Sequence, residues 1–228
     1  MTGDPAGVVA QALSPHGLIL RGGFDFAGGD DRPAGPSGAK AGSVLLVGSA
    51  GAGWWPHFVA WRARQPAGLA DPLDRWAREV AGEAARVAGA LLVMPNDRPY
   101  APFQQWAMRA EGLRRSPLGL LMHPEYGLWH AYRAALLFDA PLPGGAAVRE
   151  TIHLCDACAG KPCLKACPVD AYSAAGFAHG RCLDHVRGPA GEPCRSGCLD
   201  RNACPFGTAW RYPAEVQAFF QRAFARLP

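Results

Sequence analysis

The sequence predicts an α/β or α+β sheet domain followed by a small module that depends on metal for its stability. Hydrophobic residues make up 49% of the 228 positions, so the chain can bury a core of domain size. All eight cysteines fall between Cys155 and Cys204, whereas six of the seven tryptophans precede them. This uneven distribution predicts a domain with an apolar core over residues 1–145 and a cysteine-rich module over residues 146–228.

The first part of the chain interleaves short apolar runs with helical patterns, which is typical of a mixed sheet domain. Residues 27–42 are rich in Gly, Pro and Asp and predict a long hairpin loop. Helices are predicted over residues 57–64 and 104–111. Strands are predicted over residues 16–25, 44–47, 90–94, 117–122 and 133–139, and the last two of these are the last strands of the sheet.

The clearest helix begins after Asp71, which is a favourable N-cap residue. Pro72 suits the first helical position, and Asp74 favours the positive end of the helix dipole. A stripe of apolar side chains at spacings of three and four residues faces the core: Leu73, Trp76, Val80, Ala84 and Val87. A final amphipathic helix is predicted over residues 214–227.

Charge and hydropathy exclude two classes of partner. The formal net charge is +4 and the basic residues are scattered, so no phosphate-binding stripe and no nucleic-acid partner are expected. The N-terminal residues lack the apolar run of a signal peptide, and no apolar run approaches the ~18 residues of a membrane span. We therefore expect a cytoplasmic protein, in which clustered cysteines indicate metal binding in preference to disulfides.

The cysteine spacing is the strongest signal in the sequence. It reads Cys155-x2-Cys158-x4-Cys163-x3-Cys167-Pro168 and then Cys182-x11-Cys194-x3-Cys198-x5-Cys204-Pro205. This pattern resembles that of the bacterial two-cluster ferredoxins, C-x2-C-x2-C-x3-C-P, in which the fourth cysteine binds the other cluster. The first loop is two residues longer here, and the second half is stretched.

The resemblance implies two [4Fe-4S] clusters with interlocked ligand sets. One cluster would be held by Cys155, Cys158, Cys163 and Cys204. The other would be held by Cys167, Cys182, Cys194 and Cys198. Two structural zinc sites of four cysteines each are the alternative, since they also use C-x2-C spacing. The proline after each closing cysteine favours iron–sulfur.

Residues 123–133, HPEYGLWHAYR, form the most distinctive segment before the cysteines. They resemble the HP-x-[FY]-G-x-W-x-A-x-R segment of the cobalamin-processing proteins of the methylmalonic-aciduria type C family. Epoxyqueuosine reductases and reductive dehalogenases, which join a related cobalamin domain to a dicluster module, are similar over much of the chain. The resemblance implies these cobalamin-contacting residues: His123, Tyr126, Gly127, Trp129 and Arg133.

The resemblance further implies a flavin-reductase/nitroreductase-like sheet domain that binds base-off cobalamin beside the ferredoxin-like module. The expected function is an iron–sulfur oxidoreductase that reduces or processes the corrinoid, with electrons from a ferredoxin, a flavodoxin or a flavin reductase. One alternative is a cobalamin-dependent reductase of an organic substrate. Another is an electron-transfer module that docks a partner enzyme.

Plainer explanations exist for the motif residues. His123 could simply end a strand, and a tryptophan such as Trp129 belongs to a core more often than to a cofactor site. Arg133 lies in an apolar run, so we expect it to meet a carboxylate or a ligand anion. The glycines of residues 48–53 lack the spacing of a phosphate-binding loop and predict a tight turn.

Overall fold

The computed structural model describes residues 4–142, 151–173 and 175–227. The chain divides into two compact units. Unit 1 consists of Met1–Gly112 and Ala131–Thr151, and unit 2 of Leu113–His130 and Ile152–Pro228. Residues 113–130, which the sequence places with the first domain, thus belong with the cysteines. The predicted boundary at 145/146 lies outside the described residues.

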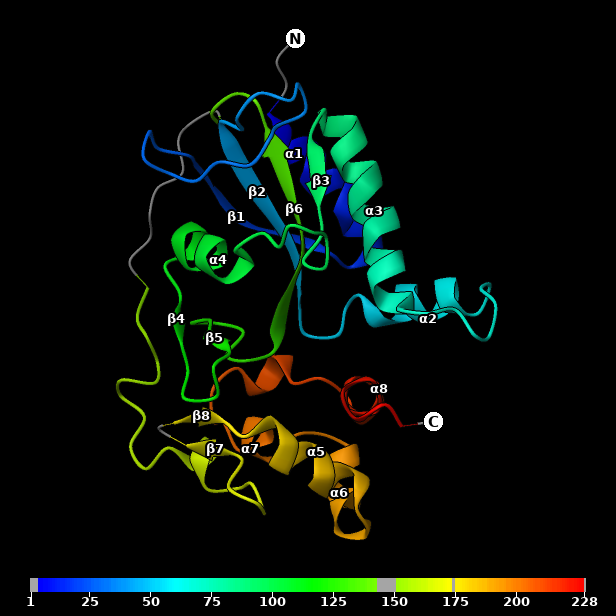
Figure 1. Cartoon of the computed structure of the whole chain (residues 1–228), viewed down its shortest axis with the longest axis vertical. Coiled ribbons are helices and arrows are strands. Elements are labelled where there is room, and N and C mark those ends of the chain that lie inside the picture. Colours follow the sequence, from blue (N-terminus) through cyan, green and yellow to red (C-terminus); the bar gives the residue numbers. More distant parts are fainter. Residues whose placement is uncertain (1–3, 143–150, 174, 228) are drawn as a thin grey trace. The chain divides into compact units, whose positions relative to one another are not determined.

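Unit 1 is built on a four-stranded sheet with the order β1-β2-β6-β3 (Figure 1). Its strands are β1 (Ile19–Asp25), β2 (Ser43–Ala50), β3 (Leu91–Val93) and β6 (His130–Phe138). The pairs β1–β2 and β3–β6 are antiparallel. Seven of the eight residues of β2 are buried, as its inner position requires. The fold is therefore α+β, with an antiparallel sheet.

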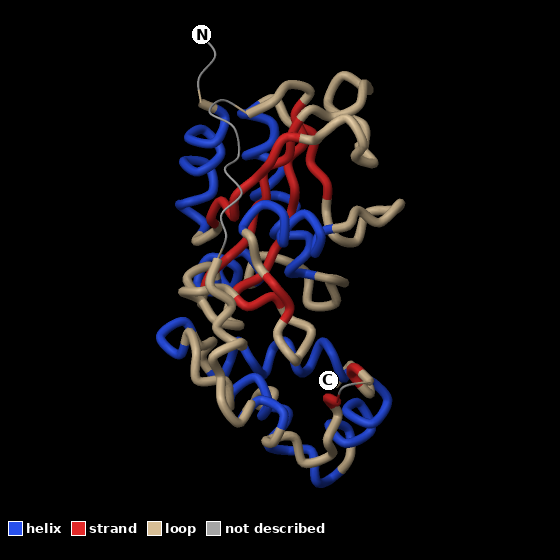
Figure 2. The backbone as a smooth tube through the Cα atoms, turned by 90° about the vertical axis from the view of Figure 1, so that its left-hand side faces the viewer, coloured by secondary structure: helices blue, strands red, loops and turns tan. Residues whose placement is uncertain are grey.

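Helices cover both faces of this sheet (Figure 2). The α-helices of unit 1 are α1 (Pro5–Leu13), α2 (Trp55–Arg62), α3 (Pro72–Ala88) and α4 (Phe103–Glu111), with a 3-10 turn at Ser14–His16. Helix α1 packs against α3 and β1, and α4 packs against β1. Helix α1 was not predicted, although its signals are present. The Asp4 carboxylate accepts the backbone N–H groups of Ala6 and Gly7, and Pro5 occupies the first turn.

Two details of α3 differ from the prediction. Asp71 precedes the helix, but it has φ 48° and its side chain makes no capping hydrogen bond. The predicted core stripe is buried through Ala84, whereas Val87 is 44% exposed. The helix ends at Ala88, and its C-cap Gly89 takes the left-handed conformation with φ 65°.

The predicted strand over residues 117–122 is wrong in extent and in place. Only β5 (Leu121–Met122) is extended, and it pairs with β4 (Arg114–Arg115) in a separate hairpin of unit 2. Pro117 has no N–H to donate, and Gly119 takes a left-handed turn with φ 75°. Strand β6, which covers most of the predicted run 133–139, is the last strand of the main sheet in chain order, and it lies between β2 and β3.

Unit 2 is rich in turns and short elements. Its helices are α5 (His179–Arg187), α6 (Glu192–Arg195), α7 (Leu199–Asn202) and α8 (Ala214–Ala225). A small hairpin is formed by β7 (Tyr172–Ser173) and β8 (Gly176–Phe177). Single 3-10 turns lie at Pro162–Leu164, Pro189–Gly191 and Thr208–Trp210. Within the described ranges, no helix has the length and apolarity needed to cross a membrane.

Candidate metal centre and motif loop

The thiols of one predicted ligand set meet in a hydrophobic cluster of unit 2. Cys155, Cys163 and Cys204 are 8%, 6% and 3% exposed and pack with Leu118, Met122 and Leu128. Burial, followed by the neighbouring thiols of Cys204, Cys155 and Cys158, raises the pKa of Cys163 to about 11. Four cysteines from distant parts of the chain are therefore brought together here.

The other four cysteines line one cavity of about 260 Å³. These are Cys167, Cys182, Cys194 and Cys198. Burial, followed by the neighbouring thiols of Cys198 and Cys167, raises the pKa of Cys182 to about 11. Cys167 follows the first three cysteines in the chain yet lies with the second group, while Cys204 does the reverse. The resemblance to two-cluster ferredoxins implies the same exchange.

Buried thiols with a raised pKa remain protonated near neutral pH, whereas metal ligands must be thiolates. Positive charge at each group would lower the free-energy cost of ionising the buried thiols. The two sets of four cysteines therefore fit a metal centre that brings several positive charges. The carboxylate of Asp200, only 1% exposed, accepts the N–H of Ala166 and holds the backbone beside Cys167. Within the described ranges, no three or more His, Cys, Asp or Glu residues form a site for a single metal ion.

The motif loop, defined here as residues 123–130, lies in the same unit as the cysteines. Backbone hydrogen bonds in both directions join His123 and Gly127 across its neck. Nδ1 of His123 accepts the N–H groups of Glu125 and Tyr126 at 3.1 Å each. A neutral His123 ring must therefore carry its proton on Nε2. The ring stacks on Tyr126 with centroids 4.0 Å apart, and both side chains keep exposed surface.

Close backbone packing holds the motif loop against the segment that follows Cys204. Gly127 has φ 57°, and a Cβ there would overlap the carbonyl of Phe206. Gly207 has φ 66°, and a Cβ there would overlap the carbonyl of Tyr126. Only glycine fits both requirements at these two positions. The predicted contact Gly127 therefore acts in chain packing.

Trp129 is fully buried inside unit 2. Its ring meets Tyr212 edge-on at 5.4 Å, and the Arg201 guanidinium lies 4.4 Å from its centroid. The same guanidinium donates to the Leu128 carbonyl at 2.5 Å. Trp129 therefore packs under the motif loop as a core residue and has no exposed surface that a ligand could contact. Arg201 carries no motif signal in the sequence, so sequence reasoning missed it.

The last predicted contact, Arg133, belongs to unit 1, where its guanidinium lies 5.3 Å from the centroid of Trp54. The structure thus divides residues 123–133 between the two units. A buried arginine–carboxylate pair is found elsewhere in unit 1. Arg21, 1% exposed, makes two hydrogen bonds to Glu111 at 3.0 and 2.9 Å.

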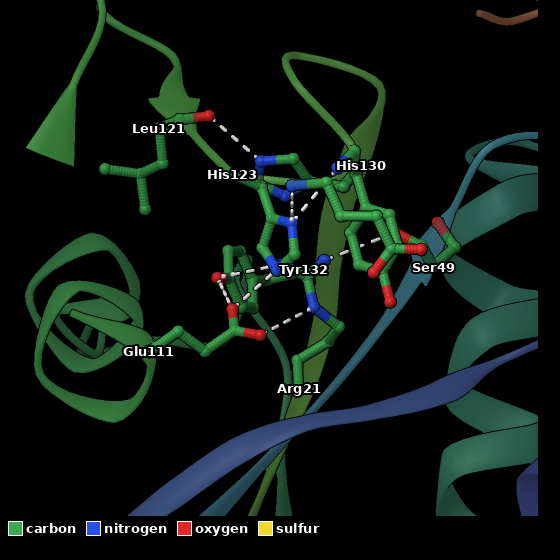
Figure 3. Close-up of polar contacts among 9 residues, drawn as sticks. Arg21, Ser49, Glu111, Leu121, His123, His130 and Tyr132 are labelled. Atoms are coloured by element: carbon green, nitrogen blue, oxygen red, sulfur yellow. Dashed lines mark hydrogen bonds and ion pairs between the residues drawn. The ribbon is translucent and has the colours of Figure 1, made fainter. Parts of the chain in front are cut away.

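Tyr132 completes that buried pair by donating its hydroxyl to Glu111 (Figure 3). Burial raises the pKa of Tyr132 well above its ordinary value, and the Glu111 carboxylate raises it further. Arg21 also donates to the Ser49 carbonyl, at 3.3 Å. The group joins β1, α4 and β6, and every charge in it has a partner, so it stabilises unit 1.

No family model and no curated protein matches this sequence. Among solved structures, the C. elegans B12-trafficking protein CblC, a homologue of human MMACHC, is 15% identical with a TM-score of 0.57. That likeness covers 97% of this chain and 91% of CblC. An epoxyqueuosine reductase in complex with a tRNA-Tyr stem loop is 15% identical with a TM-score of 0.53, covering 91% of this chain and 66% of that one.

The epoxyqueuosine reductase from Bacillus subtilis is 16% identical, with a TM-score of 0.49 over 77% of this chain. The present chain spans about half of that protein's length, since the match covers 51% of it. At these identities the likeness concerns the fold. The resemblance read from the motif and the cysteines is confirmed at that level: the chain is similar in fold to CblC and to epoxyqueuosine reductase.

Proposed function

We propose that this protein is an iron–sulfur oxidoreductase that binds cobalamin and reduces or processes it. The observation that carries the proposal is the collection of eight thiols into two sets of four within the unit that also contains the motif loop. The cobalamin part is supported by a fold similar to that of a B12-trafficking protein. We class unit 1 as a flavin-reductase-like sheet domain.

The number, the arrangement and the charge environment of the cysteine ligands support two [4Fe-4S] clusters. Four cysteines per site is the ligand number of a [4Fe-4S] cluster. The interlocked exchange of Cys167 and Cys204 is the arrangement of two-cluster ferredoxins. Lys161 donates its ammonium group to the carbonyl of Cys155, which places a positive charge beside the first group. Such a charge favours thiolate ligands.

His123 and Tyr126 are the motif residues that we propose as direct cobalamin contacts, because their side chains keep exposed surface. Gly127 and Trp129 would act indirectly, by fixing the loop that presents those two rings. Arg133 remains a prediction. Bound cobalamin would supply the cobalt that accepts a low-potential electron, and the clusters would carry that electron from a ferredoxin, flavodoxin or flavin reductase.

Metal analysis and a cobalamin titration test the proposal. Anaerobically reconstituted protein should contain about eight iron and about eight sulfide, with a broad band near roughly 400 nm that bleaches on reduction. Hydroxocobalamin should then change its visible spectrum on addition of the protein. His123→Ala should weaken binding roughly tenfold, equivalent to ~1.4 kcal/mol, while His179→Ala serves as the exposed-histidine control from the same unit.

Two outcomes contradict separate parts of the proposal. Colourless protein with stoichiometric zinc would overturn the iron–sulfur part. Protein with full clusters that neither changes the cobalamin spectrum nor retains the ligand at high micromolar concentration would overturn the cobalamin part. The chain would then be a ferredoxin-type module that docks a partner enzyme.

A second candidate function is the cobalamin-dependent reduction of an organic substrate. It is supported by the fold likeness to an epoxyqueuosine reductase bound to a modified tRNA stem loop. The scattered basic residues and the 66% coverage of that protein weigh against a tRNA substrate. Incubation of the reduced, cobalamin-loaded protein with an epoxyqueuosine-containing stem loop, followed by mass spectrometry, distinguishes the two candidates.

A further inference from the structure

Two buried side-chain nitrogens without a hydrogen-bond partner belong to residues that line the cavity of the second cysteine group. They are Nε2 of His185 and Nε of Arg201. Nε of an arginine always carries a hydrogen, and Nε2 of a histidine carries one in the imidazolium and in one neutral tautomer. Both residues line the cavity that also contains Cys167, Cys182, Cys194 and Cys198. Buried donors without an acceptor are rare, and each one costs about 1–3 kcal/mol. Two of them in one cavity indicate acceptor atoms at its centre.

Local packing fixes the guanidinium of Arg201 and the backbone that carries His185. His185 lies on α5 one turn after Cys182, and its carbonyl is covered so closely by Gly191 that a Cβ there would overlap it. Arg201 is held from three sides. Its guanidinium lies 4.4 Å from the Trp129 centroid and 4.9 Å from the Tyr212 centroid, and it donates to the Leu128 carbonyl.

The sulfur atoms of four cysteines are acceptors that this cavity offers. Its wall is otherwise mainly apolar, with side chains such as Leu118, Phe220 and Phe224. The carboxylate of Asp200 already accepts the N–H of Ala166 at 3.1 Å. Tyr172 and Gln221 also line the cavity, and the four thiolates, with the sulfides of a cluster bound to them, would be the further acceptors there. Hydrogen bonds to such sulfurs are known determinants of cluster potential.

We propose that His185 and Arg201 donate hydrogen bonds to sulfur atoms of the cluster held by the second cysteine group and thereby raise its reduction potential. The inference rests on the proposed iron–sulfur function and deepens it. One-electron reduction adds one negative charge to the cluster, so an N–H dipole aimed at a sulfur stabilises the reduced form more than the oxidised form. The two residues would set the potential at which this cluster accepts an electron from the donor.

Redox titration of the reconstituted protein, followed by electron paramagnetic resonance with dithionite as reductant, tests the inference. In His185→Phe, the ratio of reduced to oxidised second cluster should fall at least threefold at the wild-type midpoint potential. His185→Gln keeps an N–H donor and should return the ratio toward the wild-type value. His179→Phe is the matched control, since His179 begins the same helix and is exposed; its titration should not change.

Arg201 needs a variant that separates hydrogen bonding from charge. Arg201→Lys keeps the positive charge and removes Nε, so it should also lower the potential of the second cluster. The first cluster should titrate as in the wild type in every variant. Unchanged second-cluster potentials in His185→Phe and Arg201→Lys, with both clusters intact, overturn the inference and leave the proposed function standing. A wild-type protein that binds zinc overturns both.

A measurement on the wild-type protein covers the case in which a variant fails to hold its cluster. In protein whose histidine nitrogens carry a magnetic isotope label, the electron spin of the reduced second cluster should show a hyperfine coupling to a histidine nitrogen. The coupling is expected because a hydrogen bond to a cluster sulfur delocalises spin onto the donor. No histidine coupling at that cluster overturns the role of His185.

Discussion

The guanidinium of Arg201 lies 4.4 Å from the ring centroid of Trp129. Trp129 belongs to the motif loop, and Arg201 lies between the last two cysteines of the chain. Arg201 also lines the cavity of the second cysteine group. The Arg201 side chain thus contacts a core residue of the motif loop and also lines a candidate cluster site in the same compact unit.

The first prediction follows from this contact. Trp129→Ala removes a fully buried ring and should lower the free energy of unfolding of unit 2 by about 3–5 kcal/mol. The reconstituted variant should also bind less iron, because the loop and the cysteines pack in one unit. Urea unfolding and iron analysis measure both effects. Trp129→Phe keeps an aromatic partner for Arg201, and a loss as large as that of alanine would contradict the role given to this contact.

The second prediction concerns removal of metal. If metal ligation organises unit 2, the apo-protein should lose protection there, and residues 113–130 should become accessible together with residues 152–227. Hydrogen exchange or limited proteolysis of apo- and reconstituted protein measures this. The sheet of unit 1 is the internal control and should stay protected. Continued protection of residues 113–130 in the apo-protein would show that the loop folds without the metal.

The third prediction separates backbone strain from close packing. Gly119 and Gly207 both have positive φ, 75° and 66°. A Cβ on Gly119 would meet nothing within 4 Å, whereas one on Gly207 would overlap the Tyr126 carbonyl. Gly119→Ala should therefore cost about 1–2 kcal/mol from conformation alone. Gly207→Ala should cost clearly more in urea unfolding, and equal costs would exclude the close approach.

The fourth prediction tests the buried ion pair of unit 1. Glu111→Ala leaves the guanidinium of Arg21, which is 1% exposed, without its carboxylate. Such a loss should lower the free energy of unfolding by about 3–5 kcal/mol. The matched control is Glu83→Ala, because Glu83 and Arg86 are 58% and 71% exposed, and it should cost at most about 1 kcal/mol. Similar values for the two variants would contradict a structural role of the pair.

The fifth prediction is a dependence of stability on pH. Burial lowers the pKa of His16, and the nearby His57 lowers it further. The unfolded state then binds more protons than the folded state just below pH 6.5, so the stability of unit 1 should fall as the pH drops through that region. His16→Gln should make this part of the urea-midpoint profile flatter. An unchanged profile would assign the slope to other groups.

Local sequence signals were sufficient for most of unit 1. Apolar runs with β-branched residues and the spacing in residues 72–88 predicted its strands and α3, because each element buries one face in the core. The signals failed where tertiary contacts decide. Leu121 and Met122 form too short a run to choose between the main sheet and a hairpin with Arg114 and Arg115. The antiparallel order, with β6 inside the sheet, also depends on contacts distant in the chain.

The sequence by itself determined the eight cysteines, their spacing and the motif of residues 123–133, because these are properties of the order of residues. Only the tertiary structure decided that residues 113–130 fold with the cysteines, since Leu118, Met122 and Leu128 find their apolar partners there. It also decided the roles of Trp129 and Arg201. Burial and the direction of an N–H group depend on chain segments that meet only in space, and no local pattern encodes that meeting.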